Sequence, residues 1–202
     1  MDYNTHLHRC ILHAKERFKD FKAEFTQLEG ISILNWKNKS GDGEYYVRFI
    51  FDEDRERMFV SGDLGHAVFH FTEKATLFSI SKYSSLDYFM EKMVCSTNKW
   101  EYDYTSAMEE LRERLCKDDE DYDDIDFDVD ELIDDIMHEF NQYGHGLIIA
   151  SDSITDRVSQ LDPDYWEWLY DIGGFPHTRI ILWWQSLKMA AKQLRERMAE
   201  NG

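Results

Sequence analysis

Four short runs between residues 31 and 71 constrain the fold more than any other feature of this 202-residue chain. The runs cover residues 31–36, 44–51, 57–61 and 66–71, and apolar and polar side chains alternate along them. Alternation of this kind is typical of half-buried β-strands. The polar turns between the runs, KNKSGDG, DEDRE and SGDLG, are short enough for hairpins. We therefore predict an antiparallel meander.

Helical periodicity dominates the sequence on both sides of these runs. Apolar residues between positions 4 and 29 recur at alternating four- and three-residue steps, which predicts one long N-terminal helix on the apolar face of the meander. The expected fold class is α+β, with this helix packed on the meander and a helical C-terminal half after it. Further helices are predicted at 85–94, 105–116, 130–143, 163–173 and 177–199, with a short strand or buried loop at 147–150.

The length of the chain suits a single domain, residues 1–202. Within it we expect an α+β core at 1–117, an acidic segment at 118–135 and a helical lobe at 130–202. The predicted helices at the two ends of the chain carry matching heptad stripes. Such stripes fit two arrangements, packing of the helices on each other within one chain or pairing of two copies in a homodimer.

Composition narrows the class of protein. Hydrophobic residues make up 43% of the chain, which is enough for a packed core, so global disorder is not expected. The first residues lack a signal-peptide pattern, and the longest apolar run, Ile180–Trp184, is too short to span a membrane. These features predict a cytoplasmic protein without membrane contact. The widely spaced cysteines, Cys10, Cys95 and Cys116, fit reduced thiols.

Negative charge is concentrated in one segment of the sequence. Residues 118–135 contain 12 Asp or Glu residues and no Lys or Arg, and the whole chain has a net charge of −18. This charge disfavours nucleic acid as a direct ligand and favours basic partners. Proteins that bind nucleic acid are partners of that kind.

The second half of this segment alternates acidic and apolar residues. If residues 124–130 are extended, their four aspartates lie on one side, about 6.6 Å apart at a rise of roughly 3.3 Å per residue. Such a row resembles a nucleic-acid strand, in which phosphates follow one another every ~3.4 Å. Tyr122, Trp166 and Trp168 are predicted as exposed aromatic anchors. The predicted partner-binding residues are Asp118, Asp119, Glu120, Asp121, Tyr122, Asp123, Asp124, Asp126, Asp128 and Asp130.

The charged and histidine-containing segments also allow other interpretations. A solvated, partly disordered acidic loop that only keeps the protein soluble is the simplest. The segment lacks the glycine and glutamate positions of an EF-hand loop. Asp63, His66 and His70 are near one another in the sequence, but no further ligand completes a metal site. Phosphate-binding, dinucleotide-binding and hydrolase motifs are absent. We therefore predict no enzymatic activity, no cofactor and no metal.

Residues 45–76 resemble a block found in proteins of phages and mobile elements of Gram-positive bacteria. The resemblance is carried by Phe59-Val60-Ser61-Gly62-Asp63-Leu64-Gly65 and by Ala67-Val68-Phe69 after it. Small acidic proteins of that origin include anti-CRISPR inhibitors, several of which block Cas9-type nucleases by occupying nucleic-acid-binding surfaces. The resemblance implies a partner that is an RNA-guided effector with a positively charged heteroduplex channel.

The expected function is that of a non-enzymatic inhibitor that binds a basic nucleic-acid-processing protein, a CRISPR-Cas effector above all, in the host bacterial cytoplasm. Two alternatives stay open. One is an interaction or scaffold protein of a phage or bacterium, whose acidic loop is only a solvated surface. The other is a metal-dependent enzyme built on Asp63, His66 and His70.

Overall fold

The computed structural model describes residues 3–41, 43–96, 98–116, 125–143 and 150–200. The chain divides into two compact units. We call residues 7–99 with 177–202 the sheet unit, and residues 1–6 with 100–176 the helical unit. Each unit contains one cluster of buried apolar side chains of its own.

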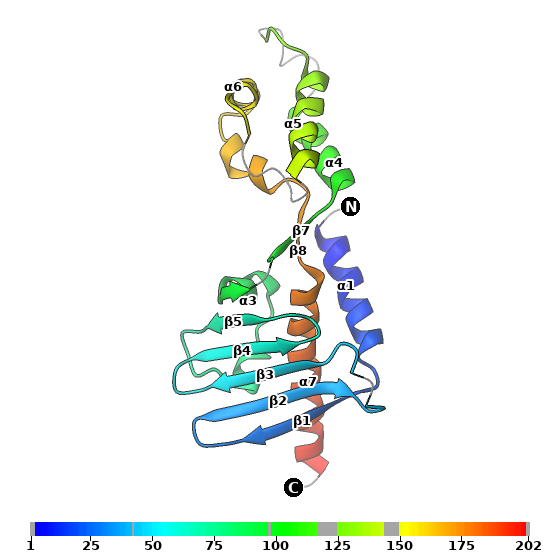
Figure 1. The fold of residues 1–202 in the computed structure, drawn as a ribbon, viewed down its shortest axis with the longest axis vertical. Helices are drawn as coiled ribbons and strands as arrows, with labels where there is room; N and C mark the ends of the chain where they lie inside the picture. The colour runs from blue at the N-terminus through cyan, green and yellow to red at the C-terminus, as the bar shows by residue number, and fades with distance from the viewer. Residues whose placement is uncertain (1–2, 42, 97, 117–124, 144–149, 201–202) are drawn as a thin grey trace. The chain divides into compact units, whose positions relative to one another are not determined.

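The sheet unit contains a six-stranded antiparallel sheet whose strands follow one another in sequence order (Figure 1). Each strand pairs with the next one along the chain. The predicted meander and the α+β fold class are therefore confirmed. The strands are β1 (Phe21–Gln27), β2 (Ile31–Asn38), β3 (Val47–Asp52), β4 (Arg57–Gly62), β5 (Ala67–His70) and β6 (Met93–Ser96).

Helices cover one face of this sheet (Figure 1). Alternate strand residues such as Val47, Phe49 and Phe51 are fully buried in the same cluster as Ile180 and Trp183 of the last helix. The other residues of each strand point to the opposite face, as the pleat requires. The covering helices are residues 7–17 of α1 (Tyr3–Arg17), with α2 (Leu77–Ile80), α3 (Leu86–Glu91) and α7 (Thr178–Glu200).

The prediction of one helix over residues 4–29 is wrong in its second half. Helix α1 ends at Arg17, and β1 follows as the edge strand of the sheet. Phe21 and Phe25 fit a period of two as well as the helical period, and pairing with β2 over the whole length of β1 satisfies the backbone groups on one side of the strand. The predicted helix at 85–94 also shortens, because residues from Met93 onward pair with β5 as β6.

Helix α7 is buried on several sides. Eight consecutive residues, from Ile180 to Leu187, are buried, so the helix belongs to the core of the sheet unit and not to its surface. Its C-terminal half also reaches the edge strand β1. The Gln193 side chain accepts a hydrogen bond from the Ala23 amide (2.7 Å) and donates one to the Phe21 carbonyl (3.1 Å), and Arg197 donates to the Ala23 carbonyl (3.1 Å).

The heptad stripes of the terminal helices are used inside the sheet unit. Ala14 of α1 is fully buried in the core cluster that contains α7, and Leu7 and Ile11 pack against it. Met198, at the end of the C-terminal stripe, is 58% exposed. Pairing of two copies through these helices stays a prediction.

The helical unit packs three α-helices around a second apolar cluster. Buried residues of α4, α5 and α6 meet there, together with Leu169 and Ile172. The short strands of this unit pair antiparallel, with Trp100 opposite Pro176. The elements are β7 (Trp100–Tyr102), α4 (Tyr104–Leu115), α5 (Val129–Tyr143), α6 (Asp152–Leu161), two 3₁₀ turns η2 (Tyr165–Glu167) and η3 (Leu169–Asp171), and β8 (Gly174–Pro176).

In this part of the chain one predicted helix is wrong, one helix was not predicted, and one predicted segment lies mostly outside the described residues. The helix predicted at 163–173 is instead the pair of 3₁₀ turns, whose bonds link residues three apart and whose tighter winding brings Trp168, Leu169 and Ile172 into the core. Helix α6 was not predicted. Of the apolar piece predicted at 147–150, only Ala150 is described, and it is buried.

The units differ in membership from the lobes expected at 1–117 and 130–202. Helix α4 belongs to the helical unit, and α7 belongs to the sheet unit although it lies at the end of the chain. Among the described residues, no helix combines the length and the apolar character that crossing a bilayer would require.

Candidate partner-binding surface of the helical unit

The acidic segment enters the described part of the chain at Ile125. Asp126, Asp128 and Asp130 are exposed, whereas Ile125, Phe127 and Val129 are half-buried. Phe127 and Val129 pack against the apolar cluster of the helical unit. The predicted alternation is therefore present as a pattern of burial. The other seven predicted residues, Asp118, Asp119, Glu120, Asp121, Tyr122, Asp123 and Asp124, lie outside the described residues.

The alternating residues do not form the extended row that the sequence suggested. No regular element covers residues 125–128, and α5 begins at Val129. The Asp128 carboxylate accepts hydrogen bonds from the amides of Asp130 (2.8 Å) and Glu131 (3.3 Å), so it caps the helix. The predicted spacing of about 6.6 Å between successive carboxylates therefore does not extend to Asp130. In a helix, successive side chains point in different directions and do not alternate between two sides.

Helix α5 continues the acidic surface beyond the predicted residues. Its exposed positions include Asp130, Glu131, Asp134 and Asp135. Carboxylates in its first turn are stabilised by the positive end of the helix dipole. Only Asp135 has a cationic partner, Arg157 of α6, at 2.6 Å among the described residues. The opposite face of α5 is apolar and buried: Leu132, Ile133, Ile136, Met137 and Phe140.

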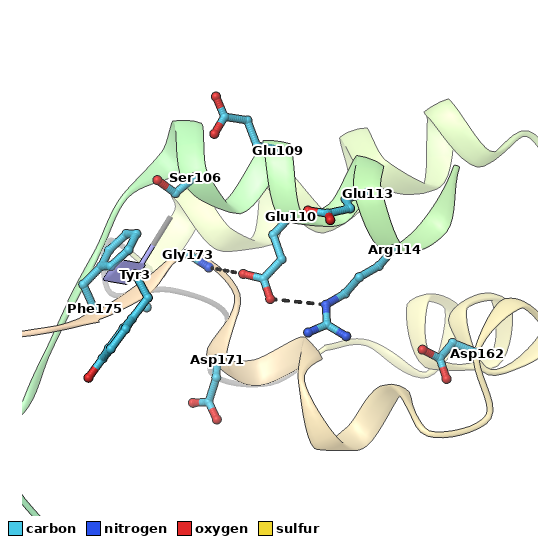
Figure 2. Close-up of a pocket in the computed structure, with 11 residues that line it drawn as sticks. Tyr3, Ser106, Glu109, Glu110, Glu113, Arg114, Asp162, Asp171, Gly173 and Phe175 are labelled. Carbon is cyan, nitrogen blue, oxygen red and sulfur yellow. Dashed lines mark hydrogen bonds and ion pairs between the residues drawn. The ribbon is translucent and has the colours of Figure 1, made fainter. Parts of the chain in front are cut away.

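A second acidic feature of the helical unit is a cavity of about 760 Å³ beside α4 (Figure 2). Glu110 points into it, where its carboxylate accepts hydrogen bonds from the Gly173 amide and from Arg114 Nε, both at 3.2 Å. Among the described residues that line the cavity, Arg114 is the only basic side chain. The acidic lining residues are Glu109, Glu110, Glu113, Asp162 and Asp171.

Two contacts fix the walls of this cavity. Gly173 adopts a φ of +63°, and a Cβ atom at this position would lie 2.6 Å from the Asp103 carbonyl oxygen, so only glycine lets the chain pass this close to α4. Asp103 caps α4 by accepting hydrogen bonds from the Ser106 hydroxyl and amide, which lowers the pKa of its carboxyl group. The start of α4 is thereby held against the segment that leads into β8.

The distribution of charge between the units is uneven. The helical unit contains 25 acidic and 4 basic residues, a net charge of −21, and the sheet unit contains 16 acidic and 19 basic residues, a net charge of +3. Burial raises the pKa of the Tyr102 hydroxyl in the helical unit, and the negative charge of Asp171 raises it further. The whole helical unit, and not only residues 118–135, is therefore the acidic part of the molecule.

The predicted aromatic anchors behave differently from one another. Trp166 is 61% exposed, as an anchor for a partner requires. The prediction that Trp168 is exposed is wrong, because its side chain is only 7% exposed. Its Nε1 donates a hydrogen bond to the Asp162 carboxylate (2.9 Å), and the Arg114 guanidinium lies over its ring. Tyr104, which is 43% exposed, was not predicted, because its position at the start of α4 gives no exposure signal in the sequence.

Asp63, His66 and His70 do not form a metal site with other described residues. Asp63 accepts a hydrogen bond from the Tyr46 amide (3.3 Å), whereas the nearest acidic partner of His70 is Glu56 (4.0 Å). Within the described ranges, no group of three or more His, Cys, Asp or Glu side chains is placed to hold a metal ion.

Comparisons of the chain with protein-family models, with curated proteins and with solved structures find no match.

Proposed function

We propose that this protein is a non-enzymatic inhibitor that binds a basic nucleic-acid-processing protein, a CRISPR-Cas effector nuclease of the Cas9 type, through the carboxylates of the helical unit. One observation carries the proposal: Phe127 and Val129 pack against the core while Asp126, Asp128 and Asp130 beside them are exposed. A merely solubilising charge needs no apolar residues between the carboxylates. The class of target comes from the resemblance over residues 45–76.

The contacts that hold the acidic residues in place before binding should raise the affinity for a partner. A charged segment that is ordered only on binding loses conformational entropy at that moment, and this loss reduces affinity. Here the core contacts of Phe127 and Val129 and the Asp128 cap hold part of the acidic row before any partner arrives. The preformed part then interacts with a Lys- and Arg-lined channel at a smaller entropic cost.

The charge of the helical unit also bears on the rate of association. A net charge of −21 on one unit attracts a positively charged channel over distances of about a Debye length, ~8 Å at physiological ionic strength. The same charge opposes direct binding of nucleic acid by this unit. A target of this kind places the protein in the cytoplasm of a bacterium.

The test compares two triple variants that change the net charge equally. Asp124→Asn, Asp126→Asn and Asp128→Asn remove three carboxylates of the row, and asparagine at 128 still caps α5. Glu29→Gln, Glu91→Gln and Glu200→Gln remove three exposed carboxylates of the sheet unit. Affinity for a guide-loaded Cas9-type effector is measured by titration at several salt concentrations.

We expect the first variant to bind about tenfold more weakly, since three exposed ion pairs contribute roughly 0.5 kcal/mol each. Its affinity also falls less steeply with salt. The second variant binds like the unaltered protein. Equal affinity of both variants at low and high salt would contradict the proposal and favour the scaffold alternative, in which the acidic loop is only a solvated surface.

A further inference from the structure

The sheet has a second face on which no described helix of the sheet unit lies (Figure 1). The strand register aligns one apolar residue from each of five neighbouring strands directly across this face. We call this line the outer row. From β2 to β6 it consists of Ile33, Ile50, Phe59, Val68 and Cys95.

The outer row is partly open to solvent. Phe59 at its centre is 37% exposed and Cys95 at its end is exposed, while the three aliphatic residues are half-buried. A hollow of about 450 Å³ adjoins Phe59, Val68 and Cys95. At ~4.8 Å between strands, the row is about 19 Å long. This length corresponds to roughly 13 residues of an α-helix, and α7 crosses the strands on the covered face in the same direction (Figure 1).

Two arginines flank the row on opposite sides. Arg48 lies two residues from Ile50 on β3, and Arg57 lies two residues from Phe59 on β4, in the rows on either side. Neither arginine forms an ion pair with a described residue, and Arg48 Nε is buried without a hydrogen-bond partner. A partner with carboxylates on both sides of an apolar stripe would complement this pattern.

The acidic residues of this face do not neutralise those arginines. Glu24 pairs with Lys22 (2.9 Å) and Lys37 (2.6 Å). Asp52 lies directly across from Arg57 in the strand register, but its ion pair is with Arg55 (3.3 Å). Unpaired charge on the face is therefore positive. The row itself is mainly aliphatic, with one aromatic ring, so it suits leucine-like side chains better than the stacked bases of a nucleic acid, which require aromatic platforms.

We propose that the outer row is a docking surface for an amphipathic helix of a second protein, with an apolar stripe and acidic residues on both flanks. The helix lies across the strands, its apolar side chains pack on Ile50 and Phe59, and its carboxylates reach Arg48 and Arg57. A second copy of this chain fits less well, because α5, which combines acidic positions with an apolar stripe, buries that stripe in the core of the helical unit. The surface is independent of the acidic helical unit, so either proposal stands if the other fails.

Two exposed cysteines provide the readout on the full-length protein. Cys95 lies in the outer row and Cys116 lies in the helical unit, so Cys116 is an internal control. The probe is a stapled helical peptide of about 15 residues, with a leucine stripe flanked by glutamates. The rate at which iodoacetamide alkylates each thiol is measured by mass spectrometry as the peptide is titrated.

We expect saturating peptide to slow alkylation of Cys95 about tenfold and to leave Cys116 unchanged. Phe59→Ser, or the pair Arg48→Gln and Arg57→Gln, should raise the peptide concentration for half-protection about tenfold. The matched pair Lys15→Gln and Lys82→Gln, which removes two exposed charges outside this face, should not change it.

Three results would overturn the proposal. One is equal protection of Cys95 and Cys116, and another is equal protection by a peptide with lysines in place of the glutamates. The third is protection of Cys95 by oligothymidine but not by the acidic peptide, which would assign the face to single-stranded nucleic acid. The double substitution Arg48→Gln and Arg57→Gln replaces charged residues of the sheet's outer face. It therefore tests the site even if the Phe59→Ser protein is unfolded.

Discussion

In the sheet unit, 16 acidic residues are matched by 19 basic ones, whereas the helical unit has 25 acidic residues and four basic ones. Both units nevertheless bury a cluster of apolar side chains. Apolar burial therefore accounts for folding in both, and the charge of the helical unit is an added property that its core tolerates. Because like charges on one compact unit repel, this property costs stability.

The largest effects on stability are expected from a cavity-forming substitution in the apolar core of each unit. Phe49 and Ile136 are both fully buried, one in each unit. We expect Phe49→Ala to lower the free energy of unfolding by about 3–5 kcal/mol and Ile136→Ala by about 2–5 kcal/mol. Chemical denaturation gives the totals, and hydrogen exchange shows which amides open. Val94→Ala, at a site that is 63% exposed, is the control. Faster exchange in α5 of the Phe49→Ala protein would mean that the units unfold together.

An intermediate effect is expected at the edge of the sheet. Gln193→Ala removes the partner of the Ala23 amide and of the Phe21 carbonyl, and the loss of a partner costs about 1–3 kcal/mol for a buried group. Light scattering should also show concentration-dependent association through the exposed edge of β1. Gln160→Ala, where an exposed side chain bonds only within its own helix, should change stability by less than about 0.5 kcal/mol. Equal effects of the two substitutions would remove any special role of this edge.

A smaller effect separates the charge of Asp128 from its capping role. Asp128→Ala should destabilise the helical unit by about 1 kcal/mol, because the amides of Asp130 and Glu131 lose their acceptor. Asp128→Asn retains an acceptor and should cost only a few tenths of a kcal/mol. Circular dichroism during denaturation measures both. Equal destabilisation by the two substitutions would show that the negative charge, and not the cap, stabilises α5.

The smallest effect concerns pH and the caps of the two units. Hydrogen bonds from the Ser106 hydroxyl and amide lower the pKa of the Asp103 carboxyl group in the folded protein. The ionised carboxylate therefore stabilises α4 fully above the pKa of Asp103 in the unfolded chain, about 3.9. This stabilisation is lost as the pH falls through the lower pKa of the folded state. Asp103→Ala should cost about 1 kcal/mol at pH 7 and less below pH ~4. Ser85→Ala, at the uncharged cap of α3, should cost a similar amount at both pH values. A constant cost for Asp103→Ala would contradict the assignment.

Local signals predicted much of the fold. The period-two runs depend on neighbours in the sequence, and the structure confirms the strands that they predict. The strand at Phe21–Gln27 was misassigned because its apolar residues satisfy two periods, and pairing with β2 decides between them. That α7 returns to the sheet, across 77 residues of the helical unit from Trp100 to Pro176, is non-local and has no sequence signal.

The candidate site was predictable to a similar extent. The alternation around Phe127 correctly indicated which side chains face the core, but its extended geometry was wrong, because residues 125–128 form no regular element and α5 begins at Val129. The cavity beside α4 could not be predicted, since it joins Glu110 to Gly173, 63 positions later. Burial of Trp168 likewise depends on tertiary contacts with Asp162 and Arg114.

The hydrogen bond between Gln193 and Ala23 has a consequence for biosynthesis. Its two residues are 170 positions apart. At a synthesis rate of about 5–20 residues per second, β1 leaves the ribosome roughly 10–35 s before the side chain that protects its edge. The meander is complete once β6 (Met93–Ser96) has followed, but its edge and its apolar face then still lack the helix that finally covers them. The nascent chain therefore passes through a stage in which it depends on chaperones or on rapid completion to avoid aggregation.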